Sequence, residues 1–176
     1  MIRASSPADI SHITRIYAEA VLHGTATFEL VPPDDAEMAR RRASLLESGF
    51  PFLVADLSGE IAGYAYAASF RSRPAYAFTV ENSIYVARAW QGKGIGGALL
   101  NALIAACEMR GFRQMIAVIG DSANEGSVAL HARAGFEMIG TARAVGRKHG
   151  QWLDTPMMQR SLGTGAHQPP EDEPTG

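Results

Sequence analysis

Apolar and polar residues alternate along this chain with two different periods, and the period identifies the helices and strands. In residues 7–22 the apolar side chains recur at the three-to-four-residue spacing of an amphipathic helix. Ser6 is suited to be its N-cap, Pro7 suits the first helical position, and His23-Gly24 ends it. A second helix is expected to begin at residues 32–35, where two acids fall in the first turn, and to end at Gly49.

Shorter apolar runs, bounded by turn residues, predict strands. They cover residues 2–4, 52–57, 61–70, 79–86, 114–120, 136–146 and 152–162. Ser58-Gly59-Glu60 is typical of a hairpin turn between two of these strands. The last two strands are expected to turn around Lys148-His149-Gly150.

Two further helices lie between the later strands. One follows a glycine-rich loop, has apolar residues on one face from Leu99 to Cys107, and ends at Gly111; the other covers residues 126–134 and ends at Gly135. Hairpins early in the chain and a strand–helix–strand crossover in its middle indicate a single α/β domain over residues 1–162. Residues 163–176 lack an apolar anchor and are expected to be a flexible tail.

Composition narrows the possible functions. The chain has 176 residues, 47% of them apolar, with 16 Lys plus Arg against 18 Asp plus Glu, which gives no case for binding nucleic acid or an anionic membrane. Cys107 is the single cysteine, so no internal disulfide can form, and we expect a reducing, cytoplasmic setting. The sequence shows neither an apolar run of membrane-spanning length nor the apolar region of a signal peptide near Met1.

The stretch from residue 79 to residue 99 is the most informative part of the sequence. An apolar strand leads into a loop with several glycines, and the loop opens directly into a helix. Backbone N–H groups at such a junction point into one concavity, where the helix dipole favours a phosphate or pyrophosphate. Glu81 lies on the strand that leads to this loop, so a carboxylate stands beside the expected anion site.

Two phosphate-binding hypotheses fit this loop. Gly92-x-Gly94-x-x-Gly97 matches the dinucleotide fingerprint, and Asp121 ends the next strand about where a ribose-binding acid is expected. However, residues 87–91 separate the strand from the glycines, and too few residues follow for the rest of a dinucleotide domain. A P-loop is excluded because Lys93 is followed by glycine.

The second hypothesis is a coenzyme A site. The segment from Gln91 to Gly96 resembles the [Arg/Gln]-x-x-Gly-x-[Gly/Ala] signature of the GNAT acyltransferase superfamily. Residues 124–136, with Asn124, Leu130-His131 and Gly135-Phe136, resemble its later Asn-x-x-[Ala/Ser]-x-x-[Leu/Phe]-Tyr-x-x-x-Gly-Phe pattern, with His131 at the usual tyrosine position.

Three further patterns resemble the phosphinothricin and methionine sulfoximine N-acetyltransferases within that superfamily. They are Thr-Val-Glu-x-Ser-x-Tyr-Val at residues 79–86, Leu130-His131, and Lys-His-Gly-x-Trp-x-Asp at residues 148–154. The resemblance implies the GNAT fold, a mixed central sheet of about seven strands flanked by helices. It also implies acetyl-CoA as co-substrate, transfer of its acetyl group to the amine of a small amino-acid-like molecule, and a possible homodimer.

The resemblance also implies where the cofactor binds. In the superfamily this strand diverges from its neighbour, and the main chain it frees binds the pantetheine arm, with the Val86 N–H as a donor to the thioester carbonyl. The cofactor-binding residues implied in this way are Ile84, Tyr85, Val86, Gln91, Gly92, Lys93, Gly94, Ile95, Gly96, Gly97 and Asn124. Asn124 can equally be the N-cap of the short helix that follows it.

Acetyl transfer to an amine requires a base, because an alkylammonium is mostly protonated near pH 7. Glu81 is the candidate general base, directly or through water, and the resemblance implies the same role. The resemblance places His131 where the superfamily tyrosine protonates the departing thiolate, and a histidine can donate that proton.

Substrate recognition is predicted from the loop before the Glu81 strand. Arg71 and Arg73 can bind a carboxylate with their fork geometry, and Tyr76 and Phe28 can form an apolar wall. No metal is expected, because the five histidines are scattered. Three alternatives remain open: an acetyltransferase for a protein, peptide or other small amine, an acetyl-CoA sensor without turnover, and the dinucleotide binder.

Overall fold

The computed structural model describes residues 1–170 of the chain and has one seven-stranded sheet with helices on both faces. The strands are β1 (Ile2–Ala4), β2 (Phe52–Leu57), β3 (Glu60–Ser69), β4 (Thr79–Val86), β5 (Gln114–Val118), β6 (Glu137–Lys148) and β7 (Gln151–Ser161). The helices are α1 (Ile10–His23), α2 (Asp35–Glu47), α3 (Ile95–Glu108) and α4 (Glu125–Arg133). Every predicted helix and strand is therefore confirmed, most of them within one or two residues at each end.

The differences from the predicted boundaries have local causes. Residues Pro7–Asp9 form a separate 3₁₀ turn (η1) before α1, because the Asp9 carboxylate accepts a hydrogen bond from Ser6 N at 2.7 Å and tightens this turn. Two more 3₁₀ turns lie in the expected loops, η2 (Pro74–Tyr76) and η3 (Arg88–Trp90). The β2–β3 hairpin turns at Ser58 and Gly59, which both have a positive φ, as predicted.

The strand order is β1-β2-β3-β4-β5-β7-β6, and only β4 and β5 pair in parallel. The connection between these two strands contains α3, as a parallel pair requires. The mixed α/β sheet of about seven strands predicted from the sequence is confirmed.

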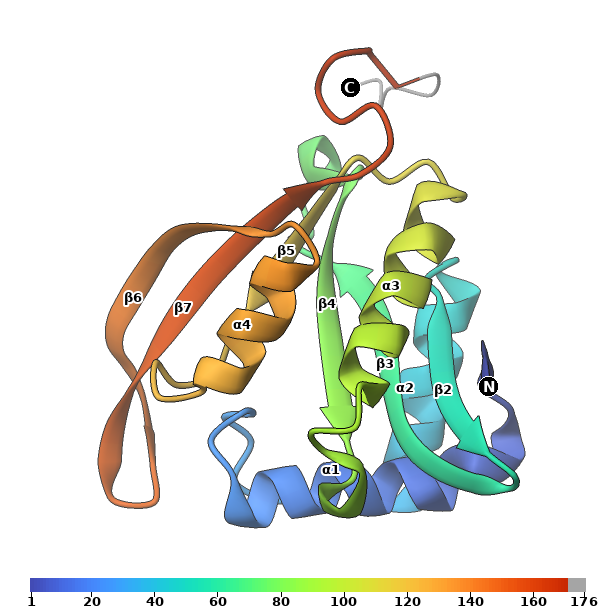
Figure 1. Cartoon of the computed structure of the whole chain (residues 1–176), viewed down its shortest axis with the longest axis vertical. Helices are drawn as coiled ribbons and strands as arrows, with labels where there is room; N and C mark the ends of the chain where they lie inside the picture. Colours follow the sequence, from blue (N-terminus) through green and yellow to red (C-terminus); the bar gives the residue numbers. More distant parts are fainter. Residues whose placement is uncertain (171–176) are drawn as a thin grey trace.

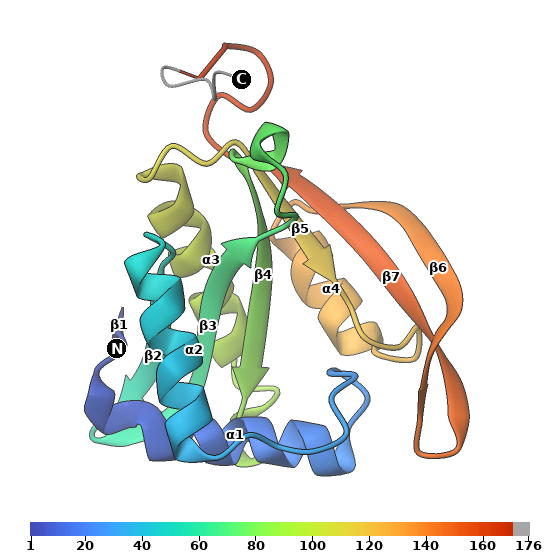
Figure 2. The ribbon, with the colours of Figure 1, turned by 180° about the vertical axis from the view of Figure 1, so that it is seen from behind.

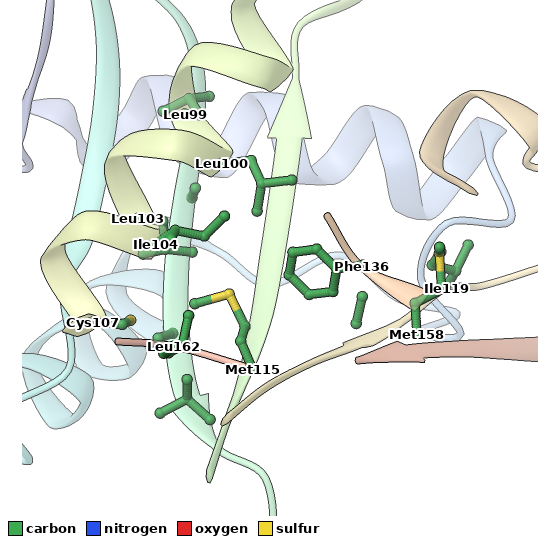
Figure 3. Close-up of a cluster of buried hydrophobic side chains, with 14 of the residues drawn as sticks. Leu99, Leu100, Leu103, Ile104, Cys107, Met115, Ile119, Phe136, Met158 and Leu162 are labelled. Carbon is green, nitrogen blue, oxygen red and sulfur yellow. The ribbon is translucent and has the colours of Figure 1, made fainter. Parts of the chain in front are cut away.

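The helices divide into two layers. Helices α3 and α4 cover one face of the sheet, and α1 and α2 cover the other, as the two opposite views show (Figures 1 and 2). The core on the α3 face contains buried leucines of α3 and residues of β5 and β7, including Met115 and Met158 (Figure 3). The core on the α1 face is built from α1 isoleucines and stacked aromatic rings of β2, β3 and β4.

The C-terminal segment begins after Leu162, which is fully buried. Gly165 N donates to Leu162 O at 2.8 Å and Gly163 N to Glu108 Oε1 at 3.3 Å, so residues just after β7 fold back onto the domain. Residues 171–176 lie outside the described part of the chain, and a flexible tail over residues 163–176 stays a prediction.

Candidate active site

Strand β4 separates from β5 halfway along its length. The two strands pair from Thr79 to Asn82, and within the described residues β5 offers no partner to residues 83–86. Beyond this point β5 follows β7 instead, with Ile119 N donating to Pro156 O at 2.9 Å. The divergence expected from the family resemblance is present, and Figure 1 shows the two strands separating toward the end of β4.

The pairing of β4 with β3 decides which main-chain groups face this gap. Ala87 N donates to Ala62 O and Phe70 N to Thr79 O, so the odd-numbered residues of β4 direct their amides and carbonyls toward β3. The even-numbered residues Ile84 and Val86 direct theirs toward the gap. The Tyr85 main chain, predicted to bind cofactor, faces β3, and its ring stacks on Tyr64 at 5.3 Å between centroids.

The glycine loop after β4 has the geometry of an anion site. Gly92 and Gly94 have φ values of +73° and +82°, a region that favours glycine, and Gly94 is the N-cap of α3. The first helical bond of α3 runs from Ala98 N to Gly94 O, which leaves the amides of Ile95, Gly96 and Gly97 free at the positive end of the helix dipole.

Side chains and close packing hold this loop in position. Gln91 Nε2 donates to Val86 O at 3.1 Å, and Lys93 Nζ lies 4.6 Å from the centre of the Trp90 ring. Gly96 of α3 packs against Leu130 of α4, where a Cβ would make an ordinary van der Waals contact with Leu130 Cδ2 at 3.4 Å. Asn124 accepts a hydrogen bond from Ser127 N at 3.2 Å, which confirms it as the N-cap of α4.

Glu81 lies on the α1 face of β4, on the paired segment just before the gap. Its carboxylate is partly buried, and no hydrogen-bond or charged partner among residues 1–170 acts on it. Burial raises the pKa of Glu81, because a charged carboxylate loses solvation there. A carboxylate of this kind is suited to accept a proton near neutral pH.

His131 lies on the opposite face of the sheet and is 4% exposed. Its Nδ1 is 2.8 Å from Ser127 O, and because a carbonyl can only accept, Nδ1 carries a proton. Its Nε2 is 3.0 Å from the Asn82 side-chain oxygen, and Asn82 Nδ2 in turn donates to Ile116 O at 3.3 Å. Burial lowers the pKa of His131, and the bond to Ser127 opposes that effect.

The structure places the four predicted substrate residues in two groups. The guanidinium of Arg71 lies 5.6 Å from the centre of the Tyr76 ring, and Arg73 begins η2 in the same loop, between β3 and β4. Glu81 pairs with Ala68, three residues before Arg71, so this loop is close to it along the strands. Phe28 belongs to a different segment, the loop between α1 and α2, and packs against Gly146 of β6.

Two hollows elsewhere contain none of the predicted site residues. One of about 830 Å³ lies between the middle of α3, the C-terminal end of α4 and the β6–β7 hairpin, and one of about 370 Å³ lies between α4 and that hairpin. Within residues 1–170 no group of three His, Cys, Asp or Glu is placed to hold a metal ion. No helix in the same part of the chain is long and apolar enough to cross a membrane.

Two residues of this region were not predicted from the sequence. Asn82 is a polar residue between Val80 and Ile84, on the strand face that packs against α3, and that break in the apolar alternation was the available signal. Tyr66 lies opposite Ser83 on the face of Glu81, and burial raises its pKa. The sequence gives no local signal for Tyr66, because its position depends on the register of β3 against β4.

Comparison with known proteins identifies the family. The family described as "Acetyltransferase (GNAT) domain" matches residues 2–157. Phosphinothricin N-acetyltransferase of Alcaligenes faecalis is 49% identical over 170 residues, which cover 97% of this chain and 86% of that protein. L-Methionine sulfoximine/L-methionine sulfone acetyltransferase of Pseudomonas aeruginosa strain PAO1 is 40% identical over 162 residues, 92% of this chain and 94% of that protein.

A solved structure agrees with both sequence comparisons. The GNAT superfamily phosphinothricin acetyltransferase of Sinorhizobium meliloti, in complex with acetyl-CoA, superposes with a TM-score of 0.95 at 51% identity, covering 98% of this chain and 93% of that one. The prediction of an acetyl-CoA-dependent acetyltransferase is confirmed, and the dinucleotide-binding alternative is wrong. The chain belongs to the GNAT acetyltransferase family.

Proposed function

We propose that this enzyme transfers the acetyl group of acetyl-CoA to the α-amine of a small amino-acid-like substrate of the phosphinothricin, methionine sulfoximine or methionine sulfone type. The names and high coverage of the relatives support this substrate class. The observation that carries the proposal is Glu81, an unpaired and partly buried carboxylate next to the point where β4 and β5 separate.

The gap between the strands supports the position of the cofactor. The free amides at the start of α3 bind the pyrophosphate, and the pantetheine arm enters beside Ile84 and Val86, whose main-chain groups face the gap. Val86 O is already bonded to Gln91, while the Val86 N–H is directed into the gap. This amide is placed to stabilise the oxyanion of the tetrahedral intermediate.

The reaction then needs three proton transfers, because the ammonium loses two protons and the thiolate gains one. Glu81 removes the first proton, directly or through water, and the amine nitrogen attacks the thioester carbonyl carbon. The nitrogen of the tetrahedral intermediate gives up its second proton to water, the carbon–sulfur bond breaks, and the coenzyme A thiolate leaves. We assign its protonation to His131, on the other face of the sheet from Glu81, so that the base and the acid act from opposite sides of the gap.

The His131 geometry sets a condition on this role. Its Nε2 is hydrogen-bonded to Asn82, which occupies the last paired position of β4 before the gap. A thiolate in the gap arrives next to this amide, and the Asn82 side chain must move away before Nε2 can reach the sulfur. Because Nδ1 already carries the proton that is donated to Ser127 O, Nε2 can donate only from the imidazolium form of His131, which burial disfavours. Sequence patterns alone did not indicate this step.

The carboxylate of the substrate is assigned to Arg71 and Arg73. Arg71 is presented over the rings of Phe70 and Tyr76, at 5.2 and 5.6 Å, so its orientation is partly fixed before substrate binds. A cytoplasmic location and a homodimer stay predictions, the first from the single cysteine and the second from the family resemblance.

A thiol-release assay tests the proposed function. Acetyl-CoA is supplied with phosphinothricin, methionine sulfoximine, methionine sulfone or a panel of peptides, and free coenzyme A is measured. We expect turnover with the amino-acid analogues. Turnover confined to peptides would overturn the substrate assignment, and tight acetyl-CoA binding without turnover on any amine would favour a sensor.

A further inference from the structure

The segment between α1 and α2 has no helix or strand from residue 24 to residue 34, yet the rest of the domain holds it firmly. Thr25 Oγ1 donates to Asp121 Oδ2 at 2.8 Å, and Thr27 Oγ1 lies 2.9 Å from the Tyr17 hydroxyl. A Cβ on Gly120 would lie 2.5 Å from Thr25 O, so this segment crosses the end of β5 in close contact.

The most unusual of these attachments is Lys148. Its side chain is 3% exposed, and its ammonium donates to the main-chain oxygen of Thr27 at 2.8 Å. Within residues 1–170 no carboxylate lies at ion-pair distance from Lys148; Glu29 acts on it only through its more distant charge. Burying an ammonium costs several kcal/mol in lost solvation unless other groups compensate it. Because a single hydrogen bond to a loop carbonyl compensates only part of this cost, the buried position of Lys148 indicates a role in holding that loop.

The same end of β6 also positions Phe28. A Cβ on Gly146 would lie 2.2 Å from Phe28 Cε2, so the aromatic ring occupies the space that any larger residue would need. Lys148 and Gly146 therefore hold two consecutive residues of the α1–α2 segment, one through a hydrogen bond and one through packing.

This segment lies next to the face of the sheet that carries Glu81. Glu29 is bonded to Arg41 of α2 at 2.7 Å. The charges of Glu81, Arg41 and Glu29 all act on the Tyr66 hydroxyl, and Tyr66 pairs with Ser83, two residues after Glu81. Glu29 and Glu81 thus both act on this tyrosine. Tyr17, whose hydroxyl contacts Thr27, packs edge-on against Tyr85 of β4, on the same face of the sheet as Glu81.

We propose that Lys148 is a positioning residue for the amine substrate. Its ammonium fixes the Thr27 carbonyl, and this holds Phe28 and Glu29 as a wall of the substrate site beside Glu81. The proposal rests on the proposed function for the identity of that substrate, an amino acid analogue with a free carboxylate.

Steady-state kinetics of three variants test the proposal. Lys148→Met removes the charge and the hydrogen bond, Lys148→Arg keeps the charge and a donor, and Arg147→Met removes a cation from the adjacent, exposed position of the same strand. In Lys148→Met we expect KM for the amino acid analogue to rise about tenfold, while kcat and KM for acetyl-CoA change less than about twofold. We expect a smaller rise in KM for the amino acid analogue in Lys148→Arg than in Lys148→Met, and the wild-type KM in Arg147→Met.

An equal rise of both KM values in Lys148→Met, or no rise in either, would overturn the proposal. A rise in KM for the amino acid analogue as large in Lys148→Arg as in Lys148→Met would also overturn it. Arginine keeps a positive charge and a hydrogen-bond donor, so an equal rise would show that neither property of Lys148 positions the substrate.

A measurement on the resting protein separates this proposal from the proposed function. The amide NMR signals of residues 27–29 should shift and lose protection from hydrogen exchange in Lys148→Met and stay unchanged in Arg147→Met. Unchanged signals in Lys148→Met would overturn the anchoring role. If these signals shift but the wild type acetylates no amino acid analogue, the anchor holds and the substrate assignment fails.

Discussion

Glu81 and Asn82 are neighbours on β4, and the sheet directs them into opposite environments. Glu81 faces α1 and α2, is partly buried, and has no bonded partner among the described residues. Asn82 faces α3 and α4, is 5% exposed, and bonds to both His131 and Ile116. The difference shows where the structure keeps a reactive group available and where it uses polar groups to fix the strand at the gap.

The Glu81 side of this comparison predicts the largest effect. Glu81→Gln keeps the shape of the side chain and removes the base, so kcat/KM should fall by about 10²–10⁴-fold. Acetyl-CoA affinity, measured by calorimetry, should stay nearly unchanged, because the cofactor loop and the Glu81 face are separate. Glu19→Gln, at an exposed position of α1, is the matched control. An equal collapse of cofactor binding would make Glu81 structural.

The contact between Asn82 and His131 predicts that substitution of His131 lowers both stability and activity. His131→Phe removes the donor to Ser127 O and the contact with Asn82, which should lower the free energy of unfolding by about 1–3 kcal/mol and also lower kcat. Thermal denaturation and kinetics measured on the same samples separate the two effects.

Asn82→Ala sharpens this prediction, since it breaks the same contact and keeps the imidazole. If His131 donates the proton, Asn82→Ala should retain more activity than His131→Phe. Identical pH–rate profiles for wild type and His131→Phe would remove His131 from the mechanism.

Asp9 is a carboxylate paired with Arg3, far along the chain from the candidate site, and its substitution is expected to have the smallest effect on activity. The pKa of Asp9 is lowered to about 2, chiefly by its hydrogen bond with Arg3, and NH1 of Arg3 lies 2.8 Å from Asp9 Oδ2. Asp9→Asn should therefore lower the free energy of unfolding at neutral pH by about 2 kcal/mol and leave kcat unchanged.

The two carboxylates should differ in the sign of their pH dependence. Because the folded pKa of Asp9 is depressed, its contribution to stability is present above its unfolded pKa, near 4, and is lost as pH falls toward 2. Because the folded pKa of Glu81 is raised, its contribution is present at low pH and is lost as pH rises through that value. Urea denaturation of both variants across pH checks this, and Glu81→Gln should not be less stable than wild type at neutral pH.

Much of the fold was accessible from the sequence, since local signals specify it. Strand β4 was predicted with its observed bounds, because apolar residues and a glycine loop delimit it. The candidate residues on β4, the glycine loop and the Arg71 loop are adjacent to these signals; the cofactor-binding residues were taken from the family resemblance, and the roles of all of them stay predictions.

Contacts between distant parts of the chain could not be predicted in this way. Asn82 meets His131 across 49 residues, and Lys148 meets Thr27 across 121. Such pairs depend on the strand register and on the path of the α1–α2 segment, which no local spacing encodes. For the same reason the sequence could place Phe28 in a loop and could not show that Gly146 makes room for its ring.

The pH dependence of kcat/KM for the amino acid analogue tests the role of Glu81 most directly. The account predicts that activity of the wild type falls on the acidic side with an apparent pKa above the ordinary value of glutamate, since burial raises the pKa of the base. The residual activity of Glu81→Gln should lack this limb. An acidic limb that persists unchanged in Glu81→Gln would show that another group accepts the proton.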